Sequence, residues 1–363
     1  MKSQVASSTD ICALKEHVSV MTRLEFKALC IVTLLAFSLC EQSNAAEPVD
    51  ECTVSSMQTG VRPGAAGPPT RVSVGMFMVD LTEISDPNQT LTGDFAVALN
   101  WTDPRLAHLE GCEISLDDIW SPGLAFFNSG RLFTSRPRVA GIGAGGSVTY
   151  AQRYFGTIAS YHDLHDFPFD DQTFRVSLVP FEWTDKEVAL IADETATGRR
   201  DLLNVSDWEI ENVQGVISKQ SAPARNAFVP QYDLIVTAHR ITGFYLWKVI
   251  LPLCLIVAMS WCVFWISPEL YGPQIGLSAT SMLTLIAFIF ATTNMVPELG
   301  YFTLLDLFIG GSTILVFVAL LESLTVTYLV SGDRKKLARR IDVISRAAFP
   351  LAFLMLVVAI FLR

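Results

Sequence analysis

The sequence predicts an antiparallel β-sandwich followed by a four-helix transmembrane bundle, and three observations support this fold class. Residues 46–243 are polar and contain short stretches with a period near two, which is typical of half-buried strands. Residues 244–363 contain four long apolar runs. Residues 1–45 have the composition of an export signal. We therefore expect one exported domain and one membrane domain.

The N-terminal segment resembles a signal peptide that carries an N-terminal extension. Arg23 and Lys27 precede the apolar stretch 28–40, and small residues at 43–45 suit a cleavage site. Cleavage there would make Ala46 the first residue of the mature chain.

Alternating stretches in residues 46–243 predict the strands of the sandwich, and clusters of turn-forming residues separate them. The stretches are 71–81, 93–101, 147–154, 173–178 and 232–239. The turn clusters are 85–88, 141–146 and 222–226. No strong amphipathic helix competes with this pattern, so two packed antiparallel sheets are expected.

The exported domain is acidic. Residues 46–243 contain 26 Asp and Glu against 14 Lys and Arg, a formal charge of −12. This charge disfavours a nucleic-acid partner and would concentrate cations at the surface, although ordinary solubility explains it equally well.

Cys52 and Cys112 are the two cysteines of this domain. Spacing alone leaves open whether they form a disulfide.

No catalytic or metal-binding motif is present in the sequence. Four histidines show no metal-ligand spacing with cysteine, no GxSxG motif occurs, and the glycine-rich run 141–146 lies between strands instead of opening a helix. These four histidines, all within residues 46–243, are His108, His162, His165 and His239. We therefore predict a protein that is not an enzyme and that needs no cofactor.

Four apolar runs are each long enough to cross about 30 Å of hydrocarbon. They are 246–265, 275–294, 304–330 and 341–362. Basic residues crowd the link between the third and fourth runs, which the positive-inside rule assigns to the cytoplasm. These residues are Arg334, Lys335, Lys336, Arg339 and Arg340. Counting through the spans then places the large domain and Arg363 on the opposite side.

The second span carries more small and hydroxyl residues than a lipid-facing helix needs. Six residues spaced by four and three share one face of a helix, polar at one end and apolar in the middle. They are Gly276, Thr280, Leu283, Ala287, Phe290 and Asn294. Such a face suits the wall of a water-filled pore, and a helix-packing surface is the alternative.

Residues 167–172, Phe-Pro-Phe-Asp-Asp-Gln, resemble the signature loop of the pentameric ligand-gated ion channels, the Cys-loop receptor superfamily. The resemblance extends from Val72 to the C-terminus. Further matches follow in the order of the family: Trp101 to Leu106, Trp120-Ser121-Pro122 with Asn128, Pro252, Asn294, Pro297, Tyr301 and Ala348-Phe349-Pro350.

The chain departs from the animal members of this family in two ways. Ser160 and Phe174 occupy the positions of the two loop cysteines, and the link between the third and fourth spans is short. Both features resemble bacterial members. The resemblance therefore implies an inner-membrane channel with its N-terminal domain and C-terminus in the periplasm.

The resemblance also implies a homopentamer in a lipid membrane, with five copies of the second span around an axial path for inorganic ions. Leu283, Ala287 and Phe290 would form an apolar constriction, and Thr280 and Gly276 would line the narrow cytoplasmic half. One amphipathic helix cannot enclose a channel, whereas cyclic symmetry repeats it around an axis.

The residues that set ion selectivity in the family differ in this chain. Where relatives carry a charge at the cytoplasmic mouth, this chain reads Gly272-Pro273-Gln274. Glu298 at the outer mouth and Glu269 before the inner mouth are the nearest acids. These acids and the acidic domain favour cations, and an anion-conducting or non-selective channel is the alternative.

In the family, agonists bind between neighbouring exported domains against aromatic side chains. The matching residues are Phe127, Phe181, Trp183 and Phe228, with Arg153 on a strand expected to face them across the interface. The aromatic rings would suit an amine, Arg153 would suit a carboxylate, and protons are a third possible agonist. Sandwich core is the alternative role for Phe181 and Trp183.

The resemblance places the coupling of ligand binding to gating where the domain meets the membrane. Asp86, Asp170 and Arg240 match a charged cluster at this junction, next to the signature residues Phe167-Pro168-Phe169. Pro297, after the second span, would receive the motion. Deeper in the membrane, we expect Glu322 and Arg346 to form a structural ion pair.

Two other classes of protein remain as alternatives. A membrane-anchored periplasmic sensor or binding protein would not need the hydroxyl-rich second span. A small transporter should show an internal repeat with broken helices, which this sequence lacks.

Overall fold

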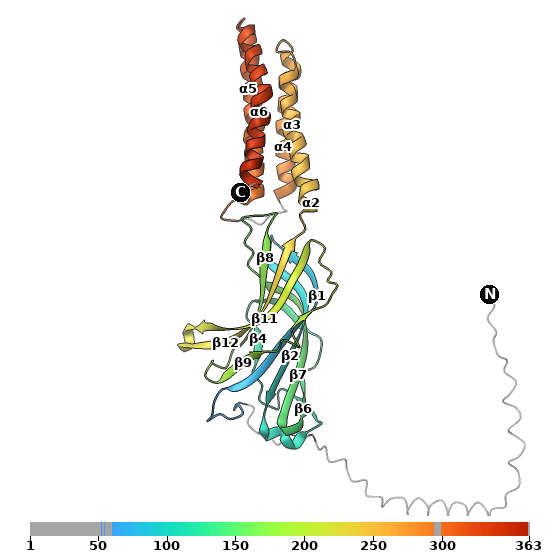
Figure 1. The fold of residues 1–363 in the computed structure, drawn as a ribbon, viewed down its shortest axis with the longest axis vertical. Coiled ribbons are helices and arrows are strands. Elements are labelled where there is room, and N and C mark those ends of the chain that lie inside the picture. The colour runs from blue at the N-terminus through green and yellow to red at the C-terminus, as the bar shows by residue number, and fades with distance from the viewer. Residues whose placement is uncertain (1–51, 53, 55–59, 294–298, 362–363) are drawn as a thin grey trace, which may run out of the picture. The chain divides into compact units, whose positions relative to one another are not determined.

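The computed structural model describes residues 52, 54, 60–293 and 299–361. Within these residues, two β-sheets pack into a sandwich and four long helical segments follow, which confirms the predicted fold class (Figure 1). The proposed signal peptide 1–45 lies outside the described residues, as do Asn294, Pro297 and Glu298.

The larger sheet has the strand order β10-β1-β2-β7-β6-β3, with β5 paired to β7 and β9 paired to β1. β2 alternates buried and half-buried positions over almost its whole length, so the period-two pattern is confirmed for this strand. The strands are β1 (Thr70–Ser85), β2 (Thr90–Thr102), β3 (Glu113–Ser115), β5 (Ser129–Thr134), β6 (Val139–Gly143), β7 (Ser147–Ala159), β9 (Val188–Ala192) and β10 (Gly198–Arg199).

The smaller sheet is antiparallel and has the order β11-β12-β8-β4. Its strands are β4 (Leu124–Phe126), β8 (Asp171–Pro180), β11 (Trp208–Ala222) and β12 (Ala227–Arg240). β12 ends at Arg240 directly before the first helix, and His239 is paired with Asp171 at the start of β8. This register brings the end of the signature loop beside the chain that enters the membrane domain.

The core between the sheets contains three tryptophans in edge-to-face contact. The rings of Trp101 and Trp120 lie 6.0 Å apart, and those of Trp120 and Trp183 lie 5.8 Å apart. Asn128 ties the sheets together, because its amide donates to the carbonyl oxygens of Ala159 in β7 and Arg175 in β8, both at 2.8 Å.

The glycine-rich turn is shorter than the sequence suggested. Residues 141–143 belong to β6, and only Ala144–Gly146 form a tight 3-10 turn, η2. Gly145 and Gly146 adopt φ angles of 67° and 77°, which residues with a Cβ rarely adopt.

Cys52 and Cys112 are both disulfide-bonded, whereas Cys254 and Cys262 are free.

Four helical segments are long and apolar enough to cross a membrane. The first comprises α2 (Gly243–Tyr245), η4 (Leu246–Ile250), α3 (Leu251–Trp261) and η5 (Cys262–Trp265), and the others are α4 (Tyr271–Thr292), α5 (Leu304–Ser331) and α6 (Lys335–Phe361). Pro252 lacks an N–H, and the helix adopts a π-helical stretch just before it. α6 begins before residue 341 because its basic residues also favour a helix.

The helices pack closely where small residues lie between them. The hydroxyl groups of Ser278 in α4 and Ser323 in α5 lie 2.8 Å apart. A Cβ at Gly311 in α5 would lie 2.5 Å from a methyl group of Leu356 in α6, so the glycine permits this close packing.

The expected ion pair between Glu322 and Arg346 does not form, although both residues are described. Arg346 donates from Nε to the carbonyl oxygen of Phe264 at 2.9 Å. Glu322 instead faces Asp342 and Ser345 on α6. Similar depth in the membrane did not determine which faces of the two helices meet.

Candidate functional site

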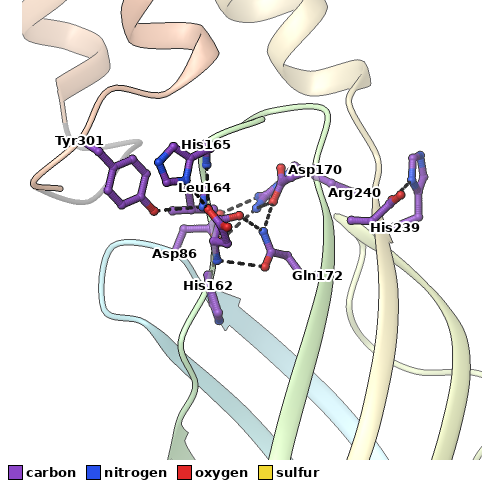
Figure 2. A network of polar contacts seen from close by, with 11 residues as sticks. Asp86, His162, Leu164, His165, Asp170, Gln172, His239, Arg240 and Tyr301 are labelled. Carbon is purple, nitrogen blue, oxygen red and sulfur yellow. Dashed lines mark hydrogen bonds and ion pairs between the residues drawn. The ribbon is translucent and has the colours of Figure 1, made fainter.

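Three segments far apart in the sequence meet at the membrane end of the sandwich. They are the turn between β1 and β2 at Asp86, the loop 160–170 before β8, and Arg240 at the end of β12 (Figure 2). The structure thus brings together three of the residues that we expected to couple the two domains.

Arg240 lies at the centre of this junction and is only 1% exposed. Its NH1 and NH2 groups donate to the two oxygens of Asp86 at 2.6 and 3.1 Å. Its Nε and NH2 groups donate to the two oxygens of Asp170 at 2.7 and 3.0 Å. Two bidentate contacts on one guanidinium fix both carboxylates in position. We call Asp86, Asp170 and Arg240 the coupling cluster.

Aromatic rings enclose the guanidinium of Arg240. Its central carbon lies 4.1 Å from the ring centre of Trp208 and 4.8 Å from that of Phe167. The Phe167 ring is fully buried and contacts the Tyr245 ring of α2 at 4.8 Å. The coupling cluster is therefore shielded from water. Electrostatic interactions between its charges are stronger in this environment than they would be in water.

Burial and charge act against each other in the coupling cluster. Burial raises the pKa of Asp86, but hydrogen bonds from His162 and Arg240 outweigh it and the pKa is lowered overall. Burial lowers the pKa of Arg240, but the carboxylates of Asp170 and Asp86 outweigh it and the pKa is raised overall. The packing therefore favours the charged form of both partners.

His162 is a member of the junction that sequence reasoning missed. Its side chain is fully buried, and its Nδ1 lies 3.0 Å from Oδ1 of Asp86. Its ring contacts Phe174 edge-to-face at 5.0 Å. The only signal in the sequence was its position in the loop that leads to Phe167.

The same loop contacts the membrane domain directly. The N–H of Leu164 donates to the Tyr301 hydroxyl at 3.1 Å, and the His165 ring stacks on the Tyr301 ring at 3.9 Å. The carbonyl oxygens of His165 and Phe167 accept from the N–H groups of Leu304 and Leu305 at the start of α5. Motion of the loop would therefore act on the beginning of the third span.

The remaining signature residues also lie at this junction. The Phe167–Pro168 peptide bond is cis. Phe169 is partly exposed, and its ring contacts Phe361 at the end of α6 at 5.4 Å. Pro297 lies outside the described residues, so its expected role stays a prediction.

The four aromatic residues of the expected ligand site gather at the opposite end of the smaller sheet. The N–H of Phe127 donates to the Ser177 carbonyl oxygen of β8, and the carbonyl oxygen of Phe228 accepts from Asp185. Phe127, Phe181 and Phe228 are about half exposed. Trp183 packs against the core through Trp120, so its alternative role as a core residue fits this contact.

Arg153 lies in the other sheet, on β7. Its guanidinium already binds Asp94 on β2, with contacts of 2.5 to 3.0 Å to both carboxylate oxygens. The structure of one subunit therefore does not bring Arg153 to the aromatic residues. A ligand carboxylate at Arg153 would have to compete with Asp94.

α4 has one face that no other part of the subunit covers. Gly276, Thr280 and Ala287 are exposed there, and Leu283 and Phe290 are 69% and 75% exposed. The hydroxyl of Thr280 donates to the carbonyl oxygen of Gly276 at 2.8 Å. The opposite face is buried in the bundle; its buried residues are Gln274, Ser278, Ser281, Leu285 and Thr292.

The inner end of α4 differs from the expectation based on sequence. Gln274 is buried and donates from its amide to the Ile266 carbonyl oxygen at 3.0 Å, so it holds the loop between the first two spans. Glu269 lies 3.8 Å from the ammonium group of Lys335. This partner offsets the charge that favoured cations at the inner mouth.

No group of three or more His, Cys, Asp or Glu side chains is placed to hold a metal ion in the part of the chain that the structure describes. At the junction, Asp86 is bound to His162 and Arg240, and Asp170 is bound to Arg240. Their arrangement suits the transmission of motion between two domains.

Comparison with known proteins identifies both halves of the chain. Residues 52–237 match the family model for the neurotransmitter-gated ion-channel ligand binding domain, and residues 249–337 match that for the neurotransmitter-gated ion-channel transmembrane region. The chain is 25% identical over 299 residues to a proton-gated ion channel of Gloeobacter violaceus, with 81% of this chain and 83% of that protein covered.

Two animal proteins are similar to the same degree. A gamma-aminobutyric acid receptor subunit beta of Lymnaea stagnalis is 24% identical over 337 residues, with 86% of this chain and 67% of that protein covered. A gamma-aminobutyric acid receptor subunit beta-like protein of Drosophila melanogaster is 26% identical over 314 residues, with 78% of this chain and 62% of that protein covered.

Proposed function

Because the chain belongs to the neurotransmitter-gated ion-channel family, whose members are ligand-gated channels and not enzymes, we propose that five copies assemble into a ring around an ion-conducting pore. In this assembly α4 lines the pore. Ligand binding between the exported domains opens it through the coupling cluster.

The uncovered face of α4 is the observation that supports the proposal most strongly. A helix in a four-helix bundle normally buries one stripe and exposes the rest to lipid. On α4 the uncovered face combines Gly276 and Thr280 with Leu283 and Phe290. Five such faces around an axis form a pore with a polar cytoplasmic half and an apolar constriction that excludes water when narrow.

The proposed agonist site lies between subunits. Phe127, Phe181 and Phe228 present half-exposed rings from one subunit, and β7 of the neighbour presents Arg153. The rings would attract an ammonium group, whereas Asp94 already binds Arg153. An amine is therefore the better-supported agonist than a carboxylate. The name of the Gloeobacter relative makes protons a further candidate.

We propose cation conduction, with anion or non-selective conduction as the alternative. The acidic exported domain would concentrate cations above the pore. The ion pair of Glu269 with Lys335 weakens the argument from the inner mouth. The basic residues around Lys335 support a cytoplasmic inner end and hence a periplasmic exported domain in an inner membrane.

Cysteine accessibility tests the pore assignment. With Cys254 and Cys262 replaced by serine, Ala287→Cys is exposed to a charged, water-soluble thiol reagent while current is recorded. We expect modification to reduce the current. Ile289→Cys, on a more covered face of α4, is the matched control and should not respond. Equal responses at both positions would contradict the assignment of the pore face.

A further inference from the structure

We propose that His162 is a proton-binding site of this channel, so that protons act as a ligand at the coupling cluster and not at the aromatic interface. This inference rests on the proposed function.

The surroundings of His162 are unusual for a histidine. The side chain is 0% exposed, and its Nδ1 lies 3.0 Å from Oδ1 of Asp86. Its Nε2 is buried without a hydrogen-bond partner among the described residues. The ring also contacts Phe174 of the sandwich core edge-to-face. The ring is therefore satisfied at one nitrogen and unsatisfied at the other.

The charges around His162 are unbalanced when the ring is neutral. Asp86 from the first turn and Asp170 from the signature loop carry two negative charges, and Arg240 from β12 carries one positive charge. Protonation of His162 would make the four groups neutral in sum. The other charged groups of the loop lie further out: Asp163 is exposed and bound to His165, and Asp166 is exposed.

Proton binding at His162 has a definite chemical consequence. Histidine is the side chain whose charge ordinarily changes between pH 5 and 8. With Nδ1–H donating to Asp86, a proton from the solvent adds to the lone pair of Nε2, forms one N–H bond, and changes no other bond. The new N–H is buried and has no acceptor in this packing, so the packing disfavours the protonated ring.

The proton therefore favours a different arrangement of the loop. A conformation in which Nε2 reaches water or an acceptor binds the proton better, so protons shift the population towards it. The imidazolium would also compete with Arg240 for Asp86. Because Leu164 and His165 contact Tyr301 and Leu304, a shift of this loop acts on the start of α5.

Currents from the full-length channel during steps between pH 8 and pH 5 test the proposal. His162→Asn keeps a donor for Asp86 but cannot take up a proton in this range. We expect it to lose the pH response, or to shift half-activation by one pH unit or more. His108→Asn, an exposed histidine in the 3-10 turn η1 (Pro104–Leu109), is the matched control and should respond as the wild type does.

A variant that conducts without agonist separates failure of this proposal from failure of the channel assignment. Leu283→Ser, which should loosen the apolar constriction, is combined with His162→Asn. Current from this double variant shows that the channel is intact. An unchanged pH response in His162→Asn would overturn the proton site. So would a wild type that shows no pH response while the Leu283→Ser variant conducts. Both outcomes would leave the channel proposal standing.

Tryptophan fluorescence measures proton binding without any current. Trp208 contacts both Phe174 and Arg240, so its emission should report on the His162 ring. The purified pentamer should show a transition between pH 5 and 8 that is absent in His162→Asn and in Trp208→Phe but present in His108→Asn. A transition that survives in His162→Asn would overturn the assignment, even if none of the variants conducts.

Discussion

Arg240 and Asp86 are 154 positions apart in the chain, yet their side chains meet through two hydrogen bonds of 2.6 and 3.1 Å. Arg240 is the last residue of β12 before the membrane domain, and Asp86 lies in the first turn of the sandwich. This contact fixes the entry of the chain into the membrane relative to the strands that start the exported domain. The contact therefore joins the first turn of the sandwich to the start of the membrane domain.

Arg240→Ala should destabilise the protein and abolish gating. It leaves the carboxylates of Asp86 and Asp170 buried without their cation, which typically costs about 3–5 kcal/mol. We expect little assembled pentamer on size-exclusion chromatography and no gated current. Lys219→Ala, which removes an exposed ion pair with Asp185, is the control and should cost less than about 1 kcal/mol. Normal currents from Arg240→Ala would contradict the proposed coupling role.

The stability of the protein should fall steeply in acid, partly because of Asp86. Its pKa is lowered in the folded state, so it contributes stability above the ordinary carboxyl pKa, and this contribution is lost as the pH falls through the folded value. Thermal unfolding between pH 6 and 3 should show the difference between wild type and Asp86→Asn shrinking below about pH 4. A difference that does not depend on pH would show that Asp86 contributes through packing alone.

Leu283→Ser should make the channel leaky. A hydroxyl at the middle of the exposed face of α4 would let water wet the constriction and lower the barrier to ions. We expect constitutive current in the absence of any agonist. Leu354→Ser, at an exposed leucine of α6, is the control and should leave the resting current unchanged. A leak of the same size from both variants would indicate a general loss of packing.

Phe181→Ala and Phe228→Ala should weaken activation by amines. A cation over an aromatic ring gains about 0.5 to 2 kcal/mol, which corresponds to an increase of about 2- to 30-fold in the half-activating concentration per ring lost. Dose–response curves with small quaternary amines measure this increase. Leu202→Ala, at an exposed leucine between β10 and β11, should have no effect. Unchanged curves in both phenylalanine variants would place the amine elsewhere.

Much of the fold could be predicted from the sequence because period-two alternation and long apolar runs report burial directly. The strands β1, β2, β7, β8 and β12 contain the predicted stretches. The family motif also pointed to the meeting of Asp86, Asp170 and Arg240, which no local pattern could have shown. α4 and α6 begin before the apolar runs do, because polar and charged residues continue a helix beyond its apolar part.

Side-chain partners were harder to predict than elements. Glu322 and Arg346 lie at similar depth, but the rotation of each helix decides which faces meet, and Glu322 faces Asp342 instead. His162 was missed because a single histidine in a loop carries no spacing signal. Its burial depends on contacts with Asp86 and Phe174, which come from other segments of the chain and meet it only in the folded domain.

Voltage-clamp recording from membranes that contain this protein tests the central claim most directly. The pH and a panel of small amines and carboxylates are varied, and the reversal potential is measured in a salt gradient. We predict a current gated by protons or an amine, with a reversal potential that shifts towards that of the cation. A correctly inserted pentamer that stays silent under all these conditions, and also as the Leu283→Ser variant, would contradict the proposal of a conducting pore lined by α4.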